Sequence, residues 1–392
     1  MDMIEILRQT VARKASDLHI SIGRPPVMRI HGELEPQKDY KVLDASDTEH
    51  LIMQIISKEQ RKELDQTLEL DCSYSIPEVS RFRVNVYFRN GGMGAAIRTI
   101  PNKIPSIREL ELPPIVDKLT QAKNGLILVT GPTGSGKSTT LAAMIDTINK
   151  TRKDHIMTIE DPIEFVYEHN KALINQRELG AHTLSFAGAL KHVLRQDPDV
   201  VLIGEMRDLE TIASAITIAE TGHLVFGTLH TMGAAQTVDR IVDVFPSYQQ
   251  QQIKMQLAGG LRAVISQTLL ARKSGGRVAA REIMVVNQAI SAMIREGKSH
   301  QLYGQLQTGA AEGMFTLEMD VARLLMRDVI TYETAISAVN DVKTFLTIIE
   351  RTPTQAAPPP TQQRPGQAAA QPRPQAPKQA PPPGKDSKSW WK

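Results

Sequence analysis

Cysteine is almost absent from this sequence, and long apolar runs are missing altogether. The single cysteine among 392 residues, Cys72, excludes an intramolecular disulfide and any metal site built from several cysteines. Such scarcity is typical of proteins in a reducing compartment. No apolar run approaches the roughly 20 residues that a membrane-spanning helix needs. Met1–Glu5 carry neither a basic leader nor an apolar segment, so we expect no secretory signal and a cytoplasmic location.

Basic charge is also scarce outside the C-terminal tail. Residues 351–392 hold seven of the 46 Lys and Arg residues and one of the 43 Asp and Glu residues, so the tail carries +6 and residues 1–350 carry −3. The mildly acidic body argues against nucleic acid as a partner. The tail also holds 11 of the 23 prolines, which predicts disorder. Its final Trp390-Trp391 either contacts a partner or a membrane surface or has no function.

Hydrophobic periodicity predicts an α/β protein with two folded domains. Residues 1–100 combine helical spacing with alternating stretches such as 81–88, as in a small α+β domain. The prolines in 101–114 indicate a linker. Residues 115–350 then alternate apolar strands with helices, which predicts a largely parallel sheet covered on its faces, followed from 248 onward by a mostly helical lobe. The expected strands are 126–130, 155–159, 200–203 and 224–227, and the helices are about 139–149, 185–196, 208–221 and 233–243.

A glycine-rich loop follows the first of these strands. Gly131-Pro132-Thr133-Gly134-Ser135-Gly136-Lys137-Ser138 matches G-x-x-x-x-G-K-[ST], the phosphate-binding loop of nucleoside triphosphatases. Its glycines let successive N–H groups face one anion, and the helix that follows adds partial positive charge. Lys137 is expected to reach the β- and γ-phosphates of ATP, and the Ser138 hydroxyl to bind Mg²⁺. The alternative is a glycine-rich turn without a ligand. The predicted nucleotide-binding residues are Thr133, Gly134, Ser135, Gly136, Lys137, Ser138 and Thr139.

Acidic residues follow two neighbouring strands, where side chains of a parallel sheet meet a ligand. Glu164, in the acidic turn after strand 155–159, is the candidate for orienting or deprotonating the attacking water. The alternative for this turn is a solvated surface. Glu205 follows the apolar strand 200–203 in a Walker B pattern, with Glu in place of the usual Asp, and would hold Mg²⁺ through water. Arg207 is expected to steady this loop.

Histidines and arginines supply the remaining candidates. His223 and His230 bracket the strand 224–227, and His230, at its carboxyl end, is the better candidate for a γ-phosphate sensor; the alternative is a structural histidine. Arg81, Arg83 and Arg98 in the first domain would act as arginine fingers if contributed across a subunit boundary. Otherwise they form a solvated strand face.

These motifs together resemble the secretion-ATPase superfamily of type II secretion and type IV pili. A Walker A loop at 131–138, an Asp box at 158–167, a Walker B box at 196–208 and a His box at 221–231 occur in that order. Within the superfamily the chain most resembles the type IV pilus retraction ATPases. That closer similarity lies in three stretches: Ala15-Ser16-Asp17-Leu18-His19-Ile20, Arg81-Phe82-Arg83-Val84-Asn85, and His300-Gln301-Leu302-Tyr303 with Gln307-Thr308-Gly309.

The resemblance implies a PAS-like N-terminal domain, a RecA-like ATPase domain and a homohexamer that binds ATP between subunits. Hydrolysis would power removal of pilins from the fibre base, against a platform protein at the cytoplasmic face of the inner membrane. The extension and secretion ATPases of the superfamily carry a tetracysteine zinc module, which a chain with one cysteine does not have.

The sequence departs from this family in two places. Retraction ATPases usually carry an Ala-Ile-Arg-Asn-Leu-Ile box, whereas residues 289–294 are Ala-Ile-Ser-Ala-Met-Ile. The difference leaves open an accessory paralogue of the motor (PilU-like) or a non-hydrolysing partner of it. The Pro-rich tail is the second departure. A ring translocase on DNA is a further alternative, since the RecA-like core is shared, but the acidic body argues against it.

Overall fold

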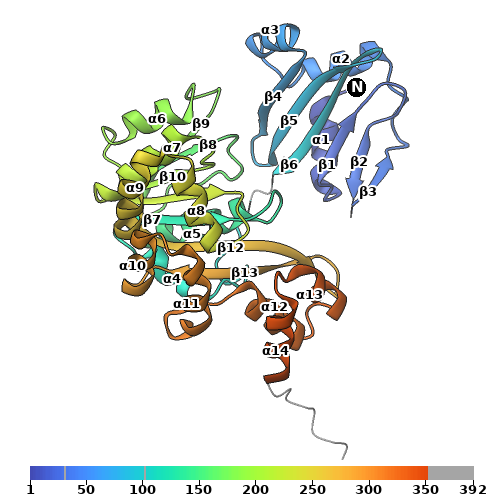
Figure 1. Ribbon diagram of the computed structural model, residues 1–392. Helices are drawn as coiled ribbons and strands as arrows, with labels where there is room; N and C mark the ends of the chain where they lie inside the picture. Colours follow the sequence, from blue (N-terminus) through green and yellow to red (C-terminus); the bar gives the residue numbers. More distant parts are fainter. Residues whose placement is uncertain (31, 101–102, 352–392) are drawn as a thin grey trace, which may run out of the picture. The chain divides into compact units, whose positions relative to one another are not determined.

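The computed structural model describes residues 1–30, 32–100 and 103–351 (Figure 1). The tail predicted to be disordered lies beyond these residues, apart from Arg351. Within the described ranges, no helix has the length and apolar character needed to cross a bilayer.

Residues 1–100 form a six-stranded antiparallel sheet in the order β3-β2-β1-β6-β5-β4. The side chains of Phe82, Val84 and Val86 alternate into its core, as the alternating pattern of 81–88 predicted, and the two-residue turn Asn90-Gly91 joins β5 to β6. Phe88, which the same alternation places on that face, is 38% exposed because it lies close to the hairpin turn. The strands are β1 (Asp17–Ile20), β2 (Val27–Ile30), β3 (Glu33–Pro36), β4 (Glu69–Ile76), β5 (Ser80–Arg89) and β6 (Gly92–Ile100), and the helices are α1 (Met3–Ala12), α2 (Ala45–Met53) and α3 (Lys58–Thr67).

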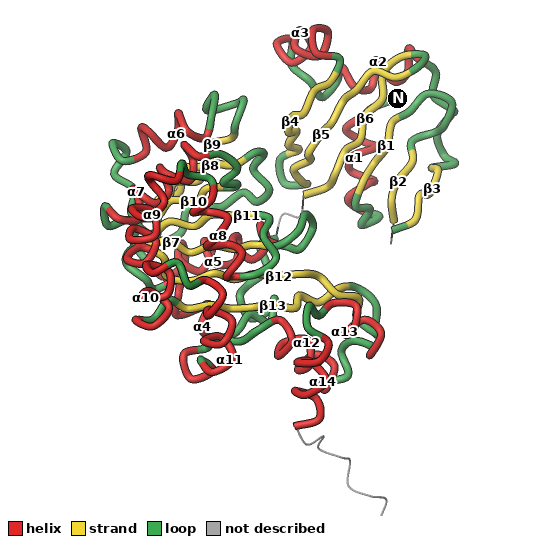
Figure 2. Tube along the Cα trace, in the orientation of Figure 1, coloured by secondary structure: helices red, strands yellow, loops and turns green. Residues whose placement is uncertain are grey.

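The second sheet has seven strands in the order β13-β12-β7-β11-β10-β8-β9 (Figure 2). Every neighbouring pair is parallel except β12 and β13, so the expectation of a largely parallel sheet is confirmed. Its strands are β7 (Gly125–Thr130), β8 (His155–Glu160), β9 (Leu173–Glu178), β10 (Val200–Ile203), β11 (Leu224–Leu229), β12 (Leu261–Ala271) and β13 (Arg277–Val285).

Helices bury both faces of this sheet. On β7, Leu126 and Leu128 pack with α6 to α11, whereas Ile127 and Val129 pack with α4 and α5. This two-sided burial explains why the strands are continuous apolar runs. The helices are α4 (Pro114–Thr120), α5 (Lys137–Thr151), α6 (Phe186–Val193), α7 (Leu209–Glu220), α8 (Ala234–Asp243), α9 (Ser247–Gly260), α10 (Gln288–Glu296) and α11 (Leu302–Thr308).

The region after residue 248 is less helical than predicted. β12 and β13 form a long hairpin, and Ser274-Gly275-Gly276 lie in its turn, with positive φ at both glycines. The prediction was wrong here because β12 gains its stability from parallel pairing with the distant β7, which local periodicity does not report. Beyond the hairpin, Leu317, Val321 and Leu324 form a buried apolar stripe on α12 (Leu317–Met326), and α13 (Tyr332–Ala338) and α14 (Val342–Arg351) pack beside it.

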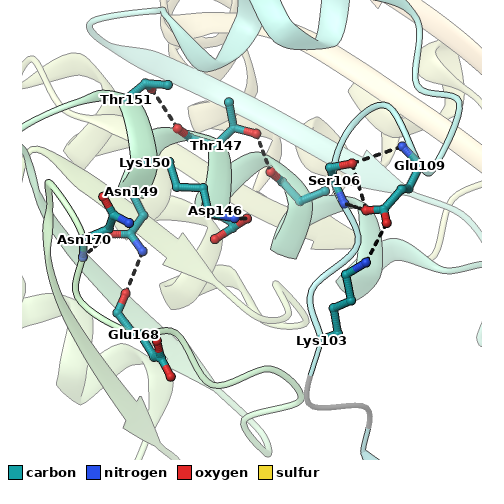
Figure 3. A network of polar contacts seen from close by, with 11 residues as sticks. Lys103, Ser106, Glu109, Asp146, Thr147, Asn149, Lys150, Thr151, Glu168 and Asn170 are labelled. Atoms are coloured by element: carbon teal, nitrogen blue, oxygen red, sulfur yellow. Dashed lines mark hydrogen bonds and ion pairs between the residues drawn. The ribbon is translucent and has the colours of Figure 1, made fainter.

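Polar contacts fix α5 at the end remote from the glycine-rich loop (Figure 3). The Asn149 amide donates to the carbonyl oxygen of Glu168 at 2.7 Å, and its oxygen accepts from the Asn170 N–H at 3.1 Å. The helix that leaves the loop is therefore anchored at its far end.

In the linker, Glu109 accepts hydrogen bonds from Lys103 and from the backbone and side chain of Ser106, which lower the pKa of Glu109 to about 2.

Candidate nucleotide-binding site

The glycine-rich loop joins the carboxyl end of β7 to the first turn of α5, as predicted. Gly131, Gly134 and Gly136 have φ values of 136°, 77° and 87°, which residues with a Cβ atom rarely adopt. A Cβ on Gly131 would lie 2.1 Å from the carbonyl oxygen of Gln267, so the loop lies directly against β12. This backbone presents N–H groups and a helix start to the same point, as anion binding requires.

Lys137 and Ser135 place an ammonium and a hydroxyl group at this loop. Lys137 Nζ donates to the carbonyl oxygens of Gly131 and Pro132, at 2.9 and 3.1 Å, and partial burial lowers the pKa of Lys137. The buried Ser135 hydroxyl has no hydrogen-bond partner within the described chain. A phosphate would accept a hydrogen bond from the unpaired Ser135 hydroxyl and would neutralise the partly buried Lys137 ammonium. Both residues therefore fit a phosphate ligand.

Glu205 and His230 meet at the same edge of the sheet, after β10 and β11. His230 Nε2 lies 2.8 Å from Glu205 Oε1, and Arg207 Nη2 donates to Glu205 Oε2 at 2.6 Å. Burial acts to raise the pKa of Glu205, but the hydrogen bonds from Arg207 and His230 outweigh it and hold the pKa below its usual value. A cavity of about 320 Å³ opens beside these residues, also lined by Gln236 and Arg240. Glu205 is therefore an ionised carboxylate at an accessible cavity.

The acidic turn after β8 holds two different kinds of carboxylate. Glu164 is exposed, and its charge, like that of Glu205, acts on the ammonium of Lys137. Glu160 is buried; it accepts from the Thr158 hydroxyl at 2.6 Å and from the Gln176 amide at 3.2 Å. Burial raises the pKa of Glu160 to about 7 despite these bonds. Glu164 therefore remains the acidic candidate with access to a ligand.

His223 lies at the other end of β11 from His230. Because β11 runs parallel to β7, the carboxyl end with His230 lies beside the glycine-rich loop and the end with His223 does not. The His223 ring contacts the Thr221 hydroxyl and the carbonyl oxygen of Ile218, both at 3.1 Å. This placement contradicts the assignment of His223 to the site and supports the structural alternative for that histidine.

The three arginines of the first domain differ in their surroundings. Arg83 and Arg98 are directly opposite each other on β5 and β6; Arg83 is exposed, and Arg98 pairs with Asp17 at 2.9 Å. Arg81 forms an ion pair with Glu178 on β9 and donates to the Ser73 hydroxyl at 2.7 Å. In this chain Arg81 is thus already paired, whereas Arg83 is free of ion pairs with any described residue.

Comparison with known proteins identifies the family that carries this site. The family model described as "Type II/IV secretion system protein" matches residues 3–275. The chain belongs to this family. Among relatives of the type II/IV secretion family, the type IV pilus retraction ATPase PilT of Pseudomonas aeruginosa is 50% identical over 86% of this chain and 97% of its own length. The type IV pilus ATPase PilU of the same organism is 37% identical over 88% of this chain and 91% of its own length.

A solved structure of the same family extends the comparison to the fold. The crystal structure of the pilus retraction motor PilT with bound ADP superimposes with a TM-score of 0.83 at 46% identity, covering 88% of this chain and 98% of that one. The expected α/β architecture, with a RecA-like ATPase core after a PAS-like domain, is therefore confirmed.

Sequence reasoning missed two buried polar residues that reach the site from the hairpin. Gln267 on β12 bonds to the glycine-rich loop and to α5. Glu282 on β13 accepts from the Ala234 N–H at the start of α8, at 2.7 Å. Both lie in the segment that was predicted to be helical, and a polar residue within an apolar run was the only signal that could have indicated them.

Proposed function

We propose that this chain is an ATP-hydrolysing motor that powers retraction of type IV pili. The observation that carries the proposal is the meeting of Lys137, Glu205 and His230 around one glycine-rich loop in a chain half identical to a retraction ATPase over most of its length. The higher identity to that ATPase than to PilU favours the motor over the accessory paralogue.

In this proposal the loop binds the triphosphate of ATP. The N–H groups of 133–138 cradle the phosphates, and Lys137 exchanges the carbonyl oxygens of Gly131 and Pro132 for phosphate oxygens. Thr139 lies in the first turn of α5, next to the same anion. The exchange is favourable because a phosphate neutralises the partly buried ammonium.

Residues suited to Mg²⁺ adjoin the phosphate position. The Ser138 hydroxyl makes no hydrogen bond to the rest of the described chain, and Glu205 is ionised. Ser138 would hold the ion directly and Glu205 through water. Bound Mg²⁺ would neutralise charge on the β- and γ-phosphates.

Three side chains then serve hydrolysis. Glu164 orients or deprotonates the attacking water, since it is the exposed carboxylate close enough to act on Lys137. His230, held by Glu205, senses the γ-phosphate. Arg207 steadies Glu205 from the other side.

We further propose a homohexamer in which Arg83 and Arg98 contact the nucleotide of a neighbouring subunit. Arg83 and Arg98 are directly opposite each other on the outer face of β5 and β6, and only Arg98 has an ion pair, with Asp17, so an anion beside them would compensate the charge of Arg83. Arg81 can join them only after leaving Glu178. The motor would act at the cytoplasmic face of the inner membrane against a platform protein, with a paralogous pilus ATPase as a further partner.

The test combines biochemistry with a deletion strain. Purified protein is expected to hydrolyse ATP and Lys137→Ala to abolish nucleotide binding or turnover, while the deletion strain is expected to be hyperpiliated and unable to twitch. Bald cells would indicate extension instead of retraction. Protein that stays monomeric and never consumes ATP would contradict the motor, and stimulation of turnover by DNA would favour a translocase.

A further inference from the structure

Gln267 bridges the glycine-rich loop to α5 from the neighbouring strand. Its Nε2 donates to the carbonyl oxygen of Ser135 at 2.7 Å, and its Oε1 accepts from the Thr140 hydroxyl at 2.9 Å. The Gln267 side chain is 3% exposed and Thr140 is also 3% exposed, so water does not compete for either bond. A buried amide with both ends satisfied is held in one orientation.

The bond to Ser135 acts on the peptide that joins Ser135 to Gly136. In a trans peptide the C=O and the following N–H point in opposite directions. A donor that holds the Ser135 carbonyl oxygen toward β12 therefore turns the Gly136 N–H away from β12, toward the open side of the loop. That N–H has no hydrogen-bond partner elsewhere in the described residues.

Without this donor the peptide has freedom to rotate. Gly136 has φ of 87° and no Cβ, so other orientations of the peptide cost it little. The Ser135 carbonyl oxygen fixes which end of the Gln267 amide faces the loop, because it only accepts hydrogen bonds and would repel an amide oxygen. The Thr140 hydroxyl donates to the other end of the amide. The Gln267 amide also lies close to Gly136 itself, because a Cβ atom at Gly136 would be 3.3 Å from Gln267 Nε2.

We propose that Gln267 is a positioning residue that presets the Ser135–Gly136 peptide for phosphate binding. It is buried between the loop and α5, and acts by directing the Gly136 N–H at the anion before the nucleotide arrives. Part of the affinity for nucleotide then comes from β12, outside the motif that defines the loop. This inference rests on the proposed use of the glycine-rich loop as the nucleotide site.

The first test replaces Gln267 by Met, which has similar length but no amide. Affinity is measured by titration of the full chain with a fluorescent ADP analogue. We expect Gln267→Met to raise the dissociation constant about tenfold, because one ordered hydrogen bond no longer fixes a binding peptide. Ser266→Ala, on the opposite face of the same strand and 4% exposed, is the matched control and should bind like the wild type.

A purely structural role predicts a different pattern. It would lower the melting temperature of the nucleotide-free protein while leaving affinity unchanged, and that result for Gln267→Met would overturn the inference. Lys137→Ala separates this failure from failure of the proposed function. If Lys137→Ala binds the analogue like the wild type, the nucleotide site is wrongly placed; if it loses binding while Gln267→Met keeps it, only the role of Gln267 is wrong.

Gln267→Glu provides a second variant with a pH readout. A protonated carboxyl group donates to the Ser135 carbonyl oxygen, whereas an ionised one repels it, and burial favours protonation. The dissociation constant of Gln267→Glu, divided by that of the wild type, should therefore decrease as the pH is lowered from about 8.5 to about 6. If Gln267→Met does not fold, this ratio of dissociation constants tests the inference instead. A ratio that stays constant as the pH is lowered overturns the inference.

Discussion

His230 Nε2 and Glu205 Oε1 are 2.8 Å apart, across the ends of two neighbouring parallel strands. A carboxylate only accepts hydrogen bonds, so Nε2 carries the proton of this contact and Nδ1 is left for another partner. The pair therefore joins the Walker B and His boxes into one unit before any nucleotide is bound.

Loss of the Glu205 carboxylate should separate binding from hydrolysis. Glu205→Ala is expected to keep nucleotide affinity near that of the wild type, because the loop and Lys137 remain. It should reduce turnover by roughly 10²–10³-fold, because His230 loses its partner and the proposed Mg²⁺ site loses its carboxylate. Nucleotide titration and steady-state turnover measure the two effects. Unchanged turnover would remove Glu205 from the site. Arg207→Ala removes the ion pair of Arg207 with Glu205 but leaves the carboxylate and its contact with His230, so it should have a smaller effect.

Arg83 and Arg81 should differ when each is replaced by alanine. Arg83→Ala removes an exposed side chain, so we expect normal stability, near-normal nucleotide binding and lower turnover in the assembled ring. Arg81→Ala leaves the Glu178 carboxylate, 8% exposed, without its ion pair, and should reduce the free energy of unfolding by about 1–3 kcal/mol. Denaturant unfolding measures the stability of each variant, and steady-state assays measure its ATP turnover. Equal turnover of Arg83→Ala and wild-type rings would count against a finger at this position.

Glu160 should make stability depend on pH. Its pKa is raised from 4.5 to about 7 in the folded protein, so the folded state holds a proton that the unfolded state releases in this range. Stability is therefore full below about pH 4.5 and declines as pH rises through about 7, by about 3 kcal/mol at most. Glu160→Gln should flatten this decline in unfolding curves recorded without nucleotide or metal. A variant with the wild-type slope would show that Glu160 is not the group responsible.

Ser291 tests whether the altered 289–294 box limits coupling to the pilus. The Ser291 hydroxyl donates to the carbonyl oxygen of Ala258 at 2.6 Å and so ties α10 to α9. Ser291→Arg restores the residue usual in retraction ATPases and should increase twitching at unchanged ATP turnover. Ser291→Ala is the control, since it removes the same hydrogen bond without adding a guanidinium. Unchanged motility of Ser291→Arg would show that this box is not limiting.

The sequence predicted those parts of the site that are local. Lys137 and the glycines lie within eight residues, and Glu205 and His230 each follow an apolar strand, so pattern and spacing were sufficient to place them at one edge of the sheet. Gln267 was not predictable in this way, because its partners Ser135 and Thr140 are more than 120 residues away in sequence. The ion pair of Arg81 with Glu178 was hidden for the same reason.

The length of β12 has a mechanical consequence. Gln267 contacts the glycine-rich loop, and Leu270, only three residues further along the same strand, is buried among α12, α13 and α14. An extended strand covers that span in about 10 Å and resists stretching. We therefore expect a displacement of these last helices to move the glycine-rich loop, and a displacement of the loop to move the helices.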